Sequence, residues 1–239
     1  MKERYMQKSL FVDGEIPDKI ILSPILKEIL TLFYAFPKKK GRAIRNFNKY
    51  IYKIVKKNSS IYVNELIAFA KSFRETRGSD RLYMGRLIFG AFKAIIGNIC
   101  LVLKRPEKSK IVIKKNINTI KDIDIKNALS IVISITDFIE NTLDYVPLKR
   151  DTLNGERKAM AVELIPDLLY CVEYPRLYQL IEKTLLCGYK SAVLSAIKFI
   201  YYCEIQGDGI IKILETVKQN SKDFDIINHV DLLLAEIKG

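Results

Sequence analysis

The chain has 239 residues, of which 49% are hydrophobic and 28% are charged, and its formal net charge is +13. This balance is ordinary for a globular protein and excludes a chain that is disordered throughout. Only 11 glycines and 7 prolines are present. Few β-hairpin turns can be built from that supply, so the composition favours helices.

In the first half of the chain, hydrophobic spacing and capping residues predict four helices after residues 1–22, which show no helical period. Ser23 and Pro24 suit an N-cap and a first helical residue, and Pro37 ends that helix. The expected helices cover residues 24–36, 41–57, 62–77 and 81–104.

Residues 109–121 are ambiguous. The alternation of Ile111 and Ile113 suits a strand, whereas the spacing of Ile113, Ile117 and Ile120 suits a helix. We favour a helix because the neighbouring segments are helical.

In the second half, Asp122 or Asp124 is expected to cap a helix over residues 125–143. A polar linker over residues 148–155 follows, and then a helix over residues 156–173 with a kink at Pro166. The remaining helices are expected at residues 175–188, 189–205, 210–220 and 223–237.

The last third contains an internal repeat, because the hydrophobic pattern of residues 175–201 recurs 33 residues later. A period in the thirties is typical of α-helical repeat arrays. The equivalent pairs include Leu177 and Ile210, Ile181 and Leu214, Val193 and Ile226, Ile197 and Val230, Phe199 and Leu232, and Ile200 and Leu233.

Residues 192–197 (Ala-Val-Leu-Ser-Ala-Ile) resemble the second helix of a HEAT-like repeat, and the resemblance extends over residues 175–237. It implies an all-α fold of antiparallel helical hairpins stacked as a HEAT-like α-solenoid. The alternative is an irregular helical bundle. We expect a basic helical region over residues 1–147 and a helical-repeat region over residues 148–239, or one continuous domain.

The surplus of basic over acidic side chains is confined to the first half of the chain. Residues 1–121 hold 27 basic and 9 acidic side chains, whereas residues 122–239 hold 13 basic and 18 acidic side chains. Compositional bias of a genome explains many lysines but does not explain why they crowd into one half. A basic half favours a polyanionic or acidic partner.

The expected helix over residues 41–57 places five basic residues within about 80° of one face, opposite an apolar face. Such a face suits a phosphate backbone, so we expect nucleic acid or an acidic protein as partner. An anionic membrane surface is less favoured, and a solvated face is the alternative. The candidate binding residues are Lys38, Lys39, Lys40, Arg42, Arg45, Lys49, Lys53, Lys56, Arg74, Arg77 and Arg81.

Signals for catalysis are weak, so we expect no catalytic residue, metal or cofactor, and an enzyme of unrecognised type is only a further alternative. His229 is the single histidine and suits a structural role on a helix. Asp137, Glu140 and Asp144 share a helical face that could hold paired carboxylates, but a solvated acidic face is the simpler interpretation.

The four cysteines, Cys100, Cys171, Cys187 and Cys203, lie among apolar residues, as buried thiols do. Their even number leaves a disulfide open, although reduced thiols are favoured where no secretion signal is seen. Residues 1–11 lack the apolar core of a signal peptide. The apolar window over residues 82–103 is interrupted by charges, so we expect a core helix and a cytoplasmic protein.

Overall fold

A computed structural model describes residues 63–64, 66–68, 70, 80–103, 111–113, 117, 120–146 and 154–238, without the side chains at 80–87, 94, 98 and 111. The chain divides into two compact units, residues 1–95 and 96–239. The predicted boundary at residues 147–148 falls inside the second unit. The helices expected at residues 24–36 and 41–57 lie outside the described residues, and the described residues between 62 and 77 are helical.

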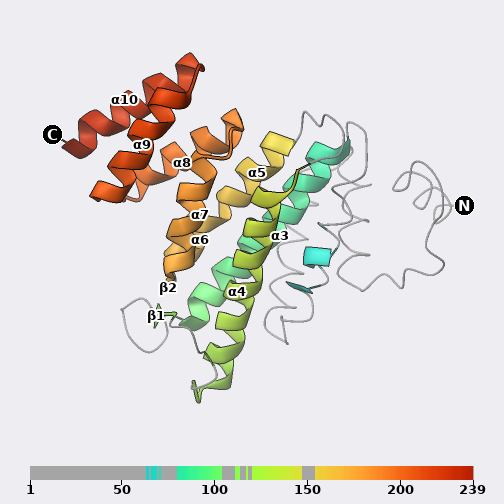
Figure 1. Ribbon diagram of the computed structural model, residues 1–239. Coiled ribbons are helices and arrows are strands. Elements are labelled where there is room, and N and C mark those ends of the chain that lie inside the picture. The colour runs from blue at the N-terminus through green and yellow to red at the C-terminus, as the bar shows by residue number, and fades with distance from the viewer. Residues whose placement is uncertain are drawn as a thin grey trace, which may run out of the picture. The chain divides into compact units, whose positions relative to one another are not determined.

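In the residues that the structure describes, the fold is all-α apart from one small sheet of two-residue strands (Figure 1). This confirms the fold class expected from the composition. The elements are α3 (Asp80–Leu103), β1 (Ile111–Val112), α4 (Ile123–Asp144), α5 (Asn154–Val162), α6 (Leu164–Leu169), β2 (Val172–Glu173), α7 (Pro175–Leu185), α8 (Lys190–Tyr202), α9 (Asp208–Asn220) and α10 (Phe224–Lys238).

The helix favoured over residues 109–121 is wrong at its start, where the chain forms β1. Ile111 pairs with Val172 and Val112 with Glu173 in a parallel register, and the Ile113 N–H donates to the Glu173 carbonyl at 2.9 Å. The strand therefore exists because a partner 61 residues away completes its hydrogen bonds.

The helix expected over residues 156–173 is broken into α5 and α6, as the predicted kink at Pro166 indicates, and its expected end is wrong because residues 172–173 form β2. Pro166 has no N–H and its ring clashes with the carbonyl four residues earlier. That residue is Val162, where α5 ends. The expected linker over residues 148–155 is wrong at its end, since Asn154 and Gly155 begin α5 and are buried.

The second unit buries one apolar face from each of its helices. The side chains of Val132 and Ile135 on α4 and of Leu177 and Ile181 on α7 are fully buried. α5 packs closely against α8. At Gly155 an added Cβ would lie 2.9 Å from Ser191 Oγ, so the absence of a side chain permits this approach.

The four C-terminal helices match the predicted hairpins. α7 begins at Pro175 and α9 at Asp208, 33 residues later. α8 packs against α5, α7 and α10, and α9 packs against α10 (Figure 1). One equivalent pair differs: Phe199 on α8 is 5% exposed, whereas Leu232 on α10 is 64% exposed. The repeat therefore predicts where the helices begin and end, whereas the burial of each residue depends on the helices that pack around it.

Candidate functional site

Most of the predicted binding residues cannot be placed. Lys38, Lys39, Lys40, Arg42, Arg45, Lys49, Lys53, Lys56, Arg74 and Arg77 lie outside the described residues. Arg81 lies in the first turn of α3, where only the backbone is described. The convergence of these side chains on one surface therefore stays a prediction.

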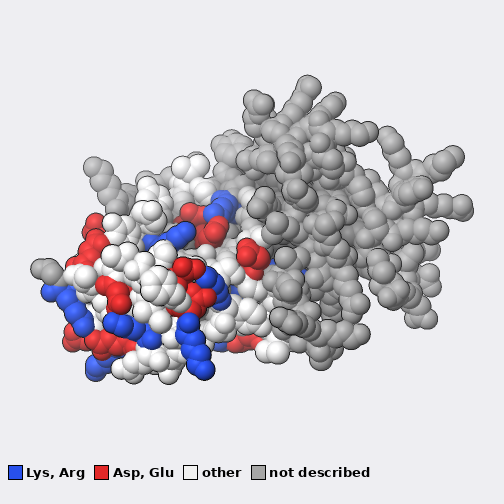
Figure 2. Space-filling model, turned by 90° about the horizontal axis from the view of Figure 1, so that it is seen from above, with Lys and Arg blue, Asp and Glu red and all other residues white. Residues whose placement is uncertain are grey.

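Charges of both signs are intermixed on the face of the described surface that Figure 2 shows. One ion-pair network joins α4 to α7. Arg176 pairs with Glu140 and with Asp137 (Nη1–Oδ1 2.5 Å), and Lys183 pairs with Asp144 (Nζ–Oδ1 2.6 Å). The hydrogen bond from Arg176 to Glu140 is the largest of the causes that raise the pKa of Arg176 above its ordinary value.

This network explains the acidic face of α4. Asp137, Glu140 and Asp144 share one face, as the sequence predicted, and their side chains are 48%, 33% and 54% exposed. The interpretation as a solvated acidic face is therefore confirmed, but the ion pairs with α7 were not predicted. Ion pairs with this much solvent exposure contribute about 0–1 kcal/mol each, so their main effect is to fix the register of α7 on α4.

A second ion-pair group joins the start of α8 to the start of α10. Lys190 pairs with Asp225 and with Asp223, whose Oδ2 lies 3.0 Å from Nζ. Asp223 Oδ1 also accepts from the N–H of Asp225 at 3.0 Å and from that of Ile226 at 3.3 Å, so it caps α10. The hydrogen bond from Lys190 is the largest cause that lowers the pKa of Asp223.

Replacing Lys190 with Met is expected to raise the pKa of Asp223 toward its ordinary value of about 3.9, because the main cause of its lowering is removed. A lowered folded-state pKa contributes stability above the unfolded pKa, and that contribution is lost as the pH falls through the folded pKa. Lys190 shows the opposite dependence on pH. Its pKa is raised, mainly by its hydrogen bond to Asp225, so the stability that it contributes is lost as the pH rises through its folded-state pKa.

An NMR titration of the side-chain carboxyl carbons measures this change directly. Lys212→Met is the matched control, because Lys212 is an exposed lysine on α9. An Asp223 pKa that is the same in the wild type and in Lys190→Met would contradict the assignment.

His229 is half-buried on α10, and its Nδ1 lies 2.7 Å from the Asp225 carbonyl, one turn earlier. This contact accounts for its position in structural terms. Among the described residues, no three His, Cys, Asp or Glu side chains are grouped to hold a metal. No helix in the described part of the chain is long and apolar enough to cross a bilayer.

A buried lysine on α5 is a site that sequence reasoning missed. Lys158 is 3% exposed. Its Nζ donates to the carbonyl of Leu143 at the end of α4 and lies 4.6 Å from the centroid of the Tyr189 ring. Asn154, one turn earlier, is 1% exposed and its Nδ2 has no hydrogen-bond partner. The apolar residues that follow Lys158 in α5 are the signal in the sequence that could have indicated its burial.

A shallow hollow lies between the end of α8 and the end of α10. Its volume is about 30 Å³. Sites for small organic molecules occupy roughly 300–1,000 Å³, so this hollow has room only for water. The lining residues are Ile200, Tyr201, Glu204, Ile205, Gln206, Leu233, Glu236 and Ile237.

No protein-family model, curated protein or solved structure matches this chain. The likeness to HEAT-like repeats therefore depends on the chain's own internal repeat. The described geometry offers helical surfaces with paired charges, and the candidate binding residues stay those that the sequence indicates.

Proposed function

We propose that this chain is a non-enzymatic binding protein whose basic first half binds a polyanion, and that the polyanion is nucleic acid. The observation that carries the proposal is the division of charge. Residues 1–121 have 27 basic and 9 acidic side chains, whereas residues 122–239 have 13 and 18. A surplus of this size in one half attracts a polyanion and accelerates its association.

The ion pairs of the second unit support this proposal. Lys218 pairs with Asp231 at 2.6 Å and Lys238 with Glu215 at 2.8 Å, in addition to the pairs made by Arg176, Lys183 and Lys190. These cations are neutralised by carboxylates of the same chain. The first half has too few carboxylates to do the same, so its surplus is available to an external anion.

The spacing of the basic residues between 42 and 56 supports nucleic acid as the anion. Side chains three and four residues apart line one helical face, where they can follow a phosphate backbone and release its counterions. Asn46, Tyr50 and Tyr52 border this face and can donate hydrogen bonds to phosphate oxygens.

We further propose that α7–α10 form two HEAT-like repeats of a short solenoid. The 33-residue offset of α7 and α9 supports this arrangement, and so does the burial shared by equivalent residues. Leu177 and Ile210 are both buried, as are Ile197 and Val230. In this proposal the repeats are the scaffold and the basic region is the binding surface.

Exposed apolar side chains favour a second candidate, a scaffold that binds an acidic protein. Tyr202 at the end of α8 and Phe224 on α10 are each 78% exposed, and Leu232 is 64% exposed. Large exposed apolar side chains are typical of protein interfaces when they gather in one area. A partner that is retained in a pull-down after nuclease treatment would support this candidate over nucleic acid.

Fluorescence anisotropy tests the first proposal, with the full chain and labelled duplex DNA, duplex RNA and single strands. Five phosphate contacts predict a slope of about −4 to −5 for log K against log salt concentration on duplex DNA. Anionic vesicles serve as the membrane probe. If none of the nucleic acids binds at low salt, the proposal is wrong.

A further inference from the structure

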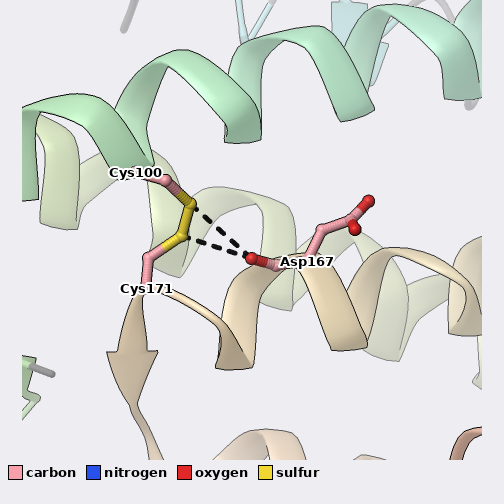
Figure 3. The surroundings of a disulfide bond; sticks show 3 residues. All are labelled: Cys100, Asp167 and Cys171. Atoms are coloured by element: carbon pink, nitrogen blue, oxygen red, sulfur yellow. Dashed lines mark hydrogen bonds between the residues drawn. A yellow bond between two sulfur atoms is a disulfide. The ribbon is translucent and has the colours of Figure 1, made fainter. Parts of the chain in front are cut away.

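Two cysteines that are 71 residues apart meet in the core of the second unit. Cys100 lies in the C-terminal half of α3, and Cys171 lies between α6 and β2. Their Cα atoms are 5.1 Å apart, within the range that a disulfide spans, and their sulfur atoms are bonded (Figure 3). The two residues are 7% and 2% exposed.

The same place can also hold two thiols. The carbonyl oxygen of Asp167, in the last turn of α6, lies 3.2 Å from the sulfur of Cys171 and 3.7 Å from that of Cys100 (Figure 3). A thiol is a weak hydrogen-bond donor. In the reduced state either S–H can therefore donate to this carbonyl. The reduced pair thus has a hydrogen-bond acceptor within the core.

The crosslink lies beside the short pairing of β1 with β2. Cys171 directly precedes β2, whose pairing with β1 involves only two residues on each strand. A two-stranded pairing is marginally stable by itself in water. A covalent bond between Cys100 and Cys171 joins the two ends of the segment between them, which contains β1.

The other two described cysteines form no disulfide in this structure. Cys203 is exposed and Cys187 is half-buried. Among the described cysteines, the buried pair is thus the one already positioned to form a disulfide.

We propose that Cys100 and Cys171 form a redox-responsive crosslink that fixes β1 and the end of α3 to the α6–β2 turn. The oxidant is a low-molecular-weight disulfide. One cysteine thiolate attacks it, forms a mixed disulfide and releases one small thiol; the other cysteine then displaces the second small thiol. Both cysteine protons end on the released thiols, so two thiols are oxidised and one small disulfide is reduced.

The test equilibrates the full chain in buffers of reduced and oxidised glutathione, followed by alkylation, mass spectrometry and thermal unfolding. We expect two alkylated cysteines in the oxidised form and four in the reduced form, with peptide mapping that joins Cys100 to Cys171. Oxidation should raise the Tm by roughly 5–15 °C. Hydrogen exchange at residues 111–113 and 172–173 should become slower.

Two variants separate this pair from the remaining thiols. The double variant Cys187→Ser/Cys203→Ser should keep the full response of the Tm to glutathione, whereas Cys171→Ser should lose it. The wild-type titration decides the matter by itself if Cys171→Ser does not fold. A crosslink through Cys187 or Cys203, four alkylated cysteines in the oxidising buffer, or a Tm that does not depend on the redox state would each overturn the proposal.

Discussion

Reversing Arg45, Lys49 and Lys53 to glutamate is expected to weaken the binding of duplex nucleic acid by about 100- to 1,000-fold near 0.1 M salt. Each of these side chains is proposed to neutralise one phosphate and displace its counterions. The loss of three such contacts should also reduce the slope of log K against log salt concentration by about 3. Fluorescence anisotropy over a range of salt concentrations measures both quantities.

The matched control reverses three lysines in the other half of the chain. Lys198, Lys212 and Lys222 are exposed, and their reversal to glutamate changes the net charge by the same amount. This variant should bind with an affinity within a few-fold of the wild type. If both variants weaken binding equally, general attraction by the net charge would replace the proposed helical face.

Both variants should keep the wild-type helical signal in circular dichroism and the wild-type Tm. A normal affinity in a folded Arg45→Glu/Lys49→Glu/Lys53→Glu variant would show that this face is only solvated. In that case the scaffold candidate, with its exposed apolar residues on α8 and α10, becomes the better hypothesis.

The features that sequence predicted well in the second unit depend on neighbours in the chain. Asp122 was one of two expected caps of α4, and its side chain accepts from the backbone N–H groups of Asp124 and Ile125. The hairpins α7–α8 and α9–α10 follow from hydrophobic spacing, from Pro175, and from Gly188 at a φ of 72°. All of these signals act within about one helical turn of the residue concerned.

The features that sequence missed depend on residues far apart in the chain. β1 requires β2, and Cys100 requires Cys171, 71 residues later. The expectation of buried cysteines is wrong for Cys203, which is exposed, and is confirmed for Cys100 and Cys171, whose disulfide the sequence left open. A cysteine among apolar neighbours gives no information on which other cysteine it meets.

The partners of charged side chains are the other feature that the sequence did not indicate. Lys158 would be expected on the surface, because lysines are almost never fully buried without a partner. Here the partners come from α4 and from the start of α8, so the local sequence could not indicate them. The same limit applies to the acidic face of α4, where the basic side chains of α7 were needed to explain it.

Replacing Lys158 with Ala is expected to lower the free energy of unfolding by about 3–5 kcal/mol. The carbonyl of Leu143 is one of the last four of α4, which have no partner within the helix. Its hydrogen bond from an ammonium group contributes about 1.5–3 kcal/mol, and the contact with the Tyr189 ring contributes about 0.5–2 kcal/mol. The buried methylene groups of the side chain account for the remainder.

Lys158→Met separates the ammonium group from the methylene groups, because it keeps the length of the side chain and removes the charge. A buried ion can cost more in desolvation than it returns in contacts, so the sign of this change is informative. We expect Lys158→Met to lie between the wild type and Lys158→Ala, since the Leu143 carbonyl would lose its donor in both variants. Urea unfolding followed by circular dichroism measures the three stabilities.

Lys212→Ala is the control, as an exposed lysine of a neighbouring helix whose loss should change stability by no more than about 0.5 kcal/mol. If Lys158→Met is as stable as the wild type, the ammonium group does not stabilise the junction of α4, α5 and α8. If Lys158→Ala is also as stable, the side chain does not contribute through packing either. If stability falls in the order wild type, Lys158→Met and Lys158→Ala, the hydrogen bond from Lys158 to the end of α4 stabilises the junction of α4, α5 and α8.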